Sequence, residues 1–193
     1  MKYRTVLLFG PPGSGKGTQG KILGAIPNLF HFSCGDVFRG LRLDSELGKI
    51  FAAYSSRGEL VPDEPTVRLW REYIEGCQQT GRFDPRRDLL VLDGIPRNVA
   101  QARMLDATLE VGALFNLTCP VLERLVERIQ RRALRDNRLD DANLDLIRAR
   151  LETYERESRP LLDHYDHRLC HRIDATQTPI GTLQEILQVL ARL

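Results

Sequence analysis

A glycine-rich segment near the N-terminus combines residue types that bind phosphate groups. It reads Gly10-Pro-Pro-Gly-Ser-Gly-Lys-Gly-Thr-Gln19 and follows a short apolar run over residues 5–9. The glycines allow several backbone N–H groups to converge on phosphate oxygens, and the helix expected over residues 16–25 adds the partial positive charge of its N-terminus. Lys16 adds a full positive charge. This spacing, between a strand and a helix, predicts a phosphate-binding loop.

One position of this segment departs from the general pattern, which has Ser or Thr directly after the lysine. Gly17 follows Lys16, and the hydroxyl comes one residue later, at Thr18. Direct coordination of Mg²⁺ by that hydroxyl therefore does not follow from the pattern.

A carboxylate stands at the end of a second apolar run. Residues 89–92 are all Leu or Val, and Asp93-Gly94 comes next. In open α/β sheets, the carboxyl ends of the strands border the crevice that binds ligands. In a protein with a phosphate-binding loop, an Asp at this place typically holds Mg²⁺ or its water ligands. Asp93 is therefore a candidate for contact with the metal.

Arginine dominates the basic residues. Of the 28 Lys and Arg residues only four are Lys, which leaves 24 Arg. Coding bias is one explanation of such a ratio. The other is that some of the arginines bind phosphate, because a planar guanidinium binds anionic oxygens through paired hydrogen bonds better than an ammonium does. Because 26 acidic residues reduce the formal net charge to +2, a general nucleic-acid binder or a protein of membrane surfaces is disfavoured.

The elements that must position these residues alternate between short apolar runs and longer helical patterns. The expected strands cover residues 5–9, 89–92, 113–117 and, more weakly, 168–173. The expected helices cover residues 16–25, 64–77, 98–110, 121–133, 144–165 and 179–193. Strands that are apolar throughout are typical of a parallel sheet covered on both faces. The 193 residues are therefore expected to form one domain, a doubly wound parallel α/β fold.

Two stretches interrupt this alternation. Residues 33–62 are helical and polar without a clear strand, which indicates a small helical lobe inserted into the domain. Residues 131–141 carry too much charge for a core element and are expected to form a solvent-facing flap. Long insertions of this kind often act as lids.

The four cysteines, Cys34, Cys77, Cys119 and Cys170, are scattered without a Cys-x-x-Cys pair, so neither a disulfide framework nor a zinc site is expected. No apolar run reaches the about eighteen residues that span a membrane, and the start of the chain lacks the apolar core and cleavage site of a signal peptide. The expectation is a cytoplasmic protein with reduced thiols.

Five segments resemble motifs of the adenylate kinase family, and together they cover nearly the whole chain. The phosphate-binding loop is similar to the family's Gly-x-Pro-Gly-x-Gly-Lys-Gly-Thr-Gln, including the displaced threonine. The others are His31-Phe-Ser-Cys-Gly-Asp-Val-Phe-Arg39, Gly58-Glu-Leu-Val-Pro-Asp-Glu64, Asp93-Gly-Ile-Pro-Arg-Asn-Val-Ala-Gln-Ala102, and Arg138-Leu-Asp-Asp141 followed by Arg150-Leu-Glu-Thr-Tyr154. The resemblance implies a P-loop kinase core, in which residues 33–62 bind a nucleoside monophosphate and residues 131–139 form a short lid.

The resemblance also implies roles for individual residues. Those that would bind ATP are Gly13, Ser14, Gly15, Lys16, Gly17, Thr18, Arg128 and Arg132. Those that would bind AMP are Cys34, Arg39, Glu59, Leu60, Val61, Gly94, Arg97, Gln101, Arg138 and Arg150. Those that would act on the transferring phosphoryl group are Lys16, Arg97, Arg132, Arg138 and Arg150. Arg148 is a possible substitute for Arg150, because the spacing from Arg138 is one residue longer than in the family. Asp93 and Asp36 would orient the water ligands of Mg²⁺, and no zinc is expected.

The choice of base depends on few residues. Gln101 stands where the adenylate-reading members of the family carry Gln, and an amide that both donates and accepts suits an adenine edge. Cys34 replaces the family's Thr, and Asn98 follows Arg97 as it does in the UMP/CMP kinases. The expected activity is reversible, Mg-dependent phosphoryl transfer from ATP to AMP, giving two ADP, by a monomer without nucleic-acid or membrane partners. A UMP/CMP kinase and a non-catalytic adenine-nucleotide sensor are the alternatives.

Overall fold

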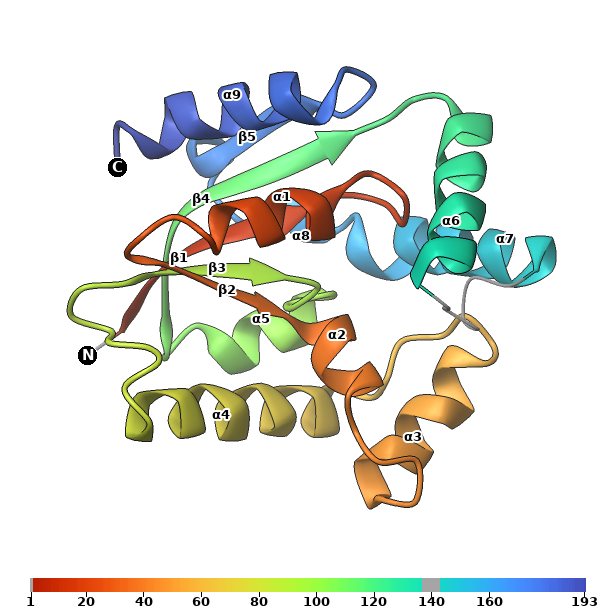
Figure 1. The fold of residues 1–193 in the computed structure, drawn as a ribbon, viewed down its shortest axis with the longest axis horizontal. Helices are drawn as coiled ribbons and strands as arrows, with labels where there is room; N and C mark the ends of the chain where they lie inside the picture. The colour runs from red at the N-terminus through yellow and green to blue at the C-terminus, as the bar shows by residue number, and fades with distance from the viewer. Residues whose placement is uncertain (1, 137–142) are drawn as a thin grey trace.

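The structure, a computed structural model, describes residues 2–136 and 143–193. The centre of this described part is a parallel sheet of five strands in the order β2-β3-β1-β4-β5 (Figure 1). The strands are β1 (Tyr3–Phe9), β2 (Leu29–Ser33), β3 (Leu89–Asp93), β4 (Leu109–Thr118) and β5 (Cys170–Asp174). Because β1 is the central strand, the loop that follows it opens in the middle of the sheet's carboxyl edge.

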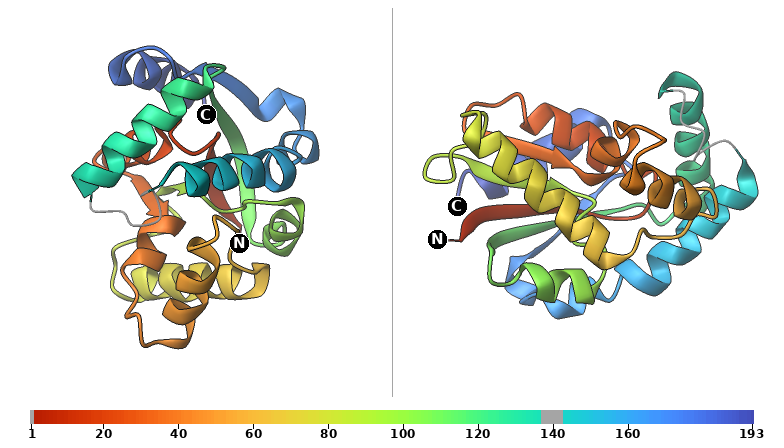
Figure 2. Two further views of the ribbon diagram at one scale, coloured as in Figure 1. Left: turned by 90° about the vertical axis from the view of Figure 1, so that its right-hand side faces the viewer. Right: turned by 90° about the horizontal axis from the view of Figure 1, so that it is seen from below.

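Helices cover both faces of the sheet (Figures 1 and 2). Those packed on its faces are α1 (Lys16–Leu23), α4 (Asp63–Gln79), α5 (Val99–Leu105), α8 (Leu161–His164) and α9 (Pro179–Leu190). Those near its carboxyl edge are α2 (Cys34–Arg39), α3 (Glu46–Ser55), α6 (Leu122–Asp136) and α7 (Leu144–Thr153). A π-helical turn over Tyr154–Ser158 continues α7, and a 3₁₀ turn over His167–Leu169 precedes β5.

The alternation of side chains along β1 divides the core into two clusters. Leu7 packs with Trp70 of α4 on one face of the sheet. Val6 and Leu8 pack with Ile186 of α9 on the other face. Successive side chains of a strand point to opposite faces, so a strand that is apolar at every position requires a cover on both. The predicted doubly wound parallel α/β fold is confirmed.

The edge strand β2 is missing from the prediction. Its sequence, Leu-Phe-His-Phe-Ser, is not apolar throughout, and only Phe32 of its residues is fully buried. An edge strand pairs on one side alone, and part of it stays accessible, so its sequence lacks the continuous apolar run of the central strands. The strand also begins directly after Asn28, whose φ of 64° is rare for a residue other than glycine.

Two predicted helices differ most from the structure in their extent. The helix expected over residues 98–110 is only α5, Val99–Leu105, because Leu109 and Glu110 already belong to β4. The helix expected over residues 144–165 is divided into α7, the π-helical turn and α8. Apolar residues such as Leu109 fit a helix or a strand equally well, and pairing with β1 decides for the strand.

The two interrupting stretches lie at the carboxyl edge of the sheet. Residues 33–62 contain α2 and α3, which project away from the sheet beside α4 (Figure 1). Of the predicted lid, residues 131–136 continue α6 as a helix, and the rest falls outside the described residues. In the part of the chain that the structure describes, no helix combines the length and the apolar character needed to cross a membrane.

Candidate active site

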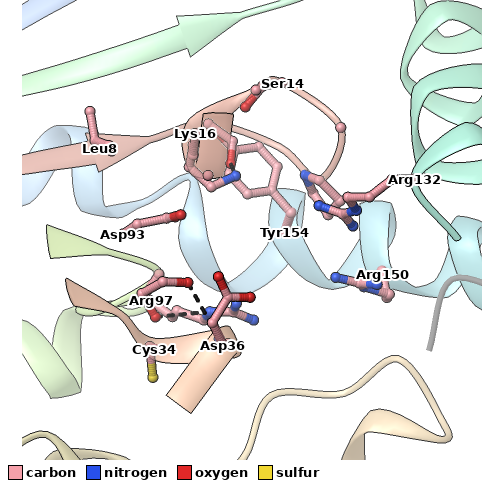
Figure 3. A pocket seen from close by; sticks show the side chains of 18 of the residues that line it. Leu8, Ser14, Lys16, Cys34, Asp36, Asp93, Arg97, Arg132, Arg150 and Tyr154 are labelled. Carbon is pink, nitrogen blue, oxygen red and sulfur yellow. Dashed lines mark hydrogen bonds between the residues drawn. The ribbon is translucent and has the colours of Figure 1, made fainter. Parts of the chain in front are cut away.

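One large cleft lies at the carboxyl edge of the sheet, where a ligand site was expected. Its volume is about 650 Å³, within the range of about 300–1,000 Å³ that is typical of ligand sites. Its walls come from the phosphate-binding loop, α2, the end of β3 and α6, α7 and the loop after β5. Figure 3 shows Lys16 and Asp93 at the centre of this space, with Arg132 and Arg150 on one side and Arg97 and Cys34 below.

The backbone of the phosphate-binding loop has a positive φ that favours glycine at Gly10, Gly13 and Gly15, and the first two are also closely packed. Gly10 has φ 139° and Gly13 has φ 82°, values that L side chains rarely adopt. A Cβ atom at Gly10 would collide with the Leu117 carbonyl oxygen, and one at Gly13 would lie 2.8 Å from the Leu125 carbonyl oxygen. The loop therefore packs backbone against backbone on both β4 and α6.

Lys16 is the first residue of α1 and is partly buried in the cleft. Its Nζ donates to the carbonyl oxygens of Gly10 at 2.7 Å and Pro11 at 3.0 Å. Burial lowers the pKa of Lys16 to about 8; Asp93 opposes this shift, whereas nearby arginines lower the pKa further. A cation held at such a cost among other cations indicates a site for an anion of high charge.

The arginines that act on Lys16 come from three different elements. They are Arg97, which follows β3, Arg132 on α6 and Arg150 on α7. The Nε of Arg97 donates to the Gly94 carbonyl oxygen at 3.0 Å, which directs its guanidinium along the cleft. Three guanidinium groups and one ammonium around one space can bind the oxygens of more than one phosphate.

Two carboxylates face the same space. Asp93 ends β3 and is 8% exposed, and its Oδ2 would lie 3.5 Å from a Cβ atom placed on Gly17. Asp36 on α2 accepts from Arg39 at 2.6 Å. Among the described residues, no three or more His, Cys, Asp or Glu side chains gather to hold a metal ion. Such a donor set fits Mg²⁺, which keeps water ligands and is typically bound through one or two carboxylates and phosphate oxygens of the substrate.

The loop after β5 closes one end of the cleft. Arg128 on α6 donates to the Ala175 carbonyl oxygen at 2.7 Å, and the Gln19 amide donates to the Pro179 carbonyl oxygen at 2.9 Å. Ala175 and Pro179 both line the cleft. These bonds join α1, α6 and the start of α9 around the space beside the phosphate-binding loop.

The opposite end of the cleft is lined by Cys34 and by residues of the lobe. Cys34 is 3% exposed, and burial raises the pKa of its thiol to about 12, so the thiol is neutral at physiological pH. Phe38 of α2 stacks on Phe51 of α3 at 5.3 Å between ring centroids. The Glu59 carboxylate pairs with Arg57 at 2.7 Å at the rim. This end is thus more apolar than the loop end.

The predicted site residues gather in this one cleft. Every one of them in the described part of the chain lines it: Gly13, Ser14, Gly15, Lys16, Gly17, Thr18, Cys34, Asp36, Arg39, Glu59, Leu60, Val61, Asp93, Gly94, Arg97, Gln101, Arg128, Arg132 and Arg150. Arg138 lies outside the described residues. Arg148 does not line the cleft; its side chain is 67% exposed and pairs with Asp145 at 3.6 Å. The geometry therefore favours Arg150 over Arg148.

Two residues near the cleft were not singled out from the sequence. Tyr154 lines the cleft from the π-helical turn and packs on Phe9, with ring centroids 5.6 Å apart. Asp63, at the start of α4, accepts hydrogen bonds from Asn98 and Gln101. Asp63 is 35 positions from Asn98 and 38 from Gln101, and no spacing rule links residues so far apart. The only signal in the sequence was its place in the segment Gly58–Glu64, which resembles a family motif.

Comparison with known proteins agrees with this arrangement. The family model described as "Adenylate kinase" matches residues 8–169. The adenylate kinase of Thermobifida fusca is 39% identical over 189 residues, which cover 95% of this chain and 94% of the relative. Those of Synechococcus sp. and Flavobacterium psychrophilum are 36% and 35% identical, over 99% and 96% of this chain. From the matched motifs, the parallel sheet and these relatives together, we conclude that this chain belongs to the adenylate kinase family of nucleoside-monophosphate kinases.

Proposed function

We propose that this chain transfers the terminal phosphoryl group of Mg·ATP to AMP, reversibly, to give two ADP. The observation that carries this proposal is the convergence of Lys16, Arg97, Arg132 and Arg150 between two dissimilar ends of one cleft. The loop end is built to bind a chain of phosphates, and the end at Cys34 is built for a smaller, less charged group. A donor and an acceptor nucleotide would then meet with their phosphates at the four cations.

These cations supply what the reaction requires. Phosphoryl transfer spreads charge over the transferring group, and catalysis consists mainly of positioning and charge neutralisation. Lys16 would bind the phosphates of the donor, and Arg97 the phosphate of the acceptor together with Arg39. Arg132 and Arg150, which approach from α6 and α7, would bind the group in transit. Arg128 would lie over the adenine of ATP, next to the loop that its guanidinium already contacts.

Mg²⁺ would be held by phosphate oxygens and by water molecules that Asp93 and Asp36 orient. The metal would neutralise charge that develops on the transferring group. The two carboxylates line the cleft, and no third acidic, His or Cys side chain joins them among the described residues. This arrangement suits an Mg²⁺ ion that keeps water ligands and is bound mainly through the phosphates of the substrate.

Closure of both covers would exclude water from the reacting phosphates. Residues 33–62 would close over AMP, and residues 131–139, with Arg138, would close over ATP. A donor phosphate left open to bulk water would be hydrolysed rather than transferred. Hydrolysis of ATP in the absence of AMP should therefore be slow compared with transfer.

The test is ADP formation from Mg·ATP with AMP, CMP, UMP, GMP and dAMP offered separately. Strong preference for AMP supports the proposal. Preference for CMP or UMP would support phosphoryl transfer but contradict the assignment of Gln101 to adenine. That outcome is considered because Asn98 follows Arg97, as it does in the UMP/CMP kinases. Absence of turnover with all five, together with measurable ATP binding, would favour a nucleotide sensor.

A further inference from the structure

A network of hydrogen bonds lies behind the wall of the cleft at the end opposite the loop. The Asp63 Oδ1 accepts from the Asn98 amide at 2.8 Å and from the Gln101 amide at 2.9 Å. The Asn98 Oδ1 accepts from the Gln101 backbone N–H at 2.8 Å and caps α5. The Gln101 Oε1 accepts from the Arg97 backbone N–H at 2.8 Å. The network therefore starts and ends on backbone N–H groups.

The two backbone N–H groups and the Asp63 carboxylate between them determine the direction of every bond in the network. A backbone N–H can only donate, so the Asn98 oxygen must face Gln101 and the Asn98 NH₂ group must face Asp63. An ionised carboxylate can only accept, so Asp63 must face the NH₂ group of Gln101. The Gln101 oxygen then faces the Arg97 N–H. The orientation of the Gln101 amide is thus set by the pairing of donors with acceptors and not by the shape of the side chain.

Gln101 is 1% exposed and lines the cleft, so its amide is the polar group of this network that a base can meet. After the bonds to Asp63 and Arg97, it retains a second N–H on Nε2 and a second lone pair on Oε1. Adenine offers an amino donor next to a ring-nitrogen acceptor, which pairs with such an amide in one orientation. Hypoxanthine has the same size and shape but offers an acceptor and a donor at those positions, which requires the opposite orientation.

We propose that Asp63, together with the Arg97 backbone N–H, determines specificity for the base by fixing the orientation of the Gln101 amide. This inference rests on the proposed function, in which Gln101 meets the base of the acceptor nucleotide. If Gln101 turned over, its oxygen would face the Asp63 carboxylate, and its NH₂ group would face the Arg97 N–H. Both contacts would then join like groups in a partly buried place. Asp63 is thus a residue that excludes 6-oxo bases while touching no nucleotide.

The test compares AMP with IMP as acceptor, because the two differ only at the base edge in question. The variant is Asp63→Asn, which keeps the shape but replaces the charged acceptor that Asn98 and Gln101 share with a neutral amide, so that the Gln101 NH₂ group is held in place less strongly. We expect the ratio of kcat/KM for AMP to that for IMP to fall about tenfold, as loss of one charge-assisted hydrogen bond predicts. The change should appear mainly in the KM of the acceptor, because the phosphate-binding groups are unaltered.

A matched control is Glu64→Gln, which removes the same charge one residue later from an exposed position of the first turn of α4. It should leave the AMP to IMP ratio within about twofold, as is usual for an exposed substitution without specific partners. In a Gln101→Ala background, Asp63→Asn should have no further effect on the ratio, because Asp63 acts through Gln101. A purely structural role would instead lower turnover with both acceptors equally.

Several outcomes would overturn the inference. They are an unchanged ratio in Asp63→Asn, the same fall in Glu64→Gln, and a wild-type preference for AMP over IMP smaller than about tenfold, which one fixed charge-assisted bond should exceed. Equilibrium binding of AMP and IMP is measured in parallel. If the wild-type protein transfers no phosphoryl group, the proposed function fails. The effect of Asp63→Asn on the ratio of AMP to IMP affinity would still test whether Asp63 determines specificity for the base.

Discussion

The two ends of the cleft are built by different means. At the loop end, residues 10–19, the backbone sets the geometry: Gly10 adopts a conformation that L side chains avoid, and two backbone carbonyl groups hold Lys16. At the α4–α5 end, three side chains set it: Asp63, Asn98 and Gln101. The loop end should therefore tolerate few substitutions and keep one type of ligand. At the α4–α5 end, in contrast, a single substitution can change which ligand binds.

The largest effect is expected at the loop end from Lys16→Met. The side chain fills the same space but cannot neutralise phosphate, so kcat for ADP formation should fall about 10³-fold, as for loss of a preorganised charge at a transferring group. Steady-state kinetics with Mg·ATP and AMP measure this. Lys49→Met, at an exposed position on α3, is the matched control and should stay near the wild-type rate. Near-normal turnover of Lys16→Met would show that Lys16 does not act on the transferring phosphoryl group.

The same variant should be about as stable as the wild type. The pKa of Lys16 is about 8 in the folded protein and 10.5 as the ordinary value, so its charge destabilises the folded state fully below pH 8. This destabilisation disappears as the pH rises from 8 to 10.5. Removal of the charge should offset the loss of the two bonds to Gly10 and Pro11, which leaves Tm at pH 7 within about 5 °C of wild type. A larger fall would mean that Lys16 holds the loop together.

A smaller effect is expected where α7 meets the cleft. Arg150→Ala should lower kcat about 10²-fold, because a guanidinium that faces the phosphates is lost. Arg148→Ala should change kcat less than about twofold, because that side chain is exposed and pairs only with Asp145 among the partners that the structure records. The two variants differ by two positions on one helix, so each serves as the control for the other. Reversed effects would assign the phosphate contact to Arg148.

The difference between the two ends also explains how far the sequence predicts this molecule. The loop end is local: ten consecutive residues contain the glycines and the lysine, and the apolar run before them identifies β1. The α4–α5 end is not local, because Asp63 lies 35 residues from Asn98 and 38 from Gln101. Only the packing of α4 beside α5 brings these side chains together. The sequence could indicate Gln101 as a base contact but not the carboxylate that orients it.

The secondary structure shows the same limit. The central strands β1 and β3 were predicted because burial on both faces makes them apolar at nearly every position. The edge strand β2 was not, because pairing and burial on one side leave no continuous apolar run. Elements whose form is decided by neighbours distant in the sequence, such as β2 and the start of β4, could be placed only with the structure.

ATP binding at the loop end should depend on pH. Lys16 is protonated below its pKa of about 8 in the ligand-free protein, and bound phosphate requires the charged form. ATP affinity should therefore weaken as the pH rises above 8, by up to about tenfold per pH unit. Titration of ATP between pH 7 and pH 9.5 measures this. Lys16→Arg, whose guanidinium stays charged throughout, should bind with little pH dependence over the same range.

The smallest effect is expected at the other end, from Cys34→Ala. The thiol is buried and neutral, and its neighbours across the cleft include Gly94, whose Cβ position would lie 3.7 Å from the Cys34 Cβ. Removal of the sulfur leaves a small cavity and should lower the free energy of unfolding by about 1 kcal/mol, or Tm by about 3 °C. The KM for AMP should change less than about threefold, because a thiol is a weak hydrogen-bonding group.

Measuring Tm and KM together separates packing from recognition at Cys34. A fall in Tm with a nearly constant KM means that the sulfur only fills space, and that specificity at this end comes from the Gln101 amide and the carboxylate behind it. A rise in KM of more than about tenfold exceeds what a thiol bond of ordinary strength provides. That result would make Cys34 a contact of the base, and the contrast between the two ends would then extend to a second side chain that selects the ligand.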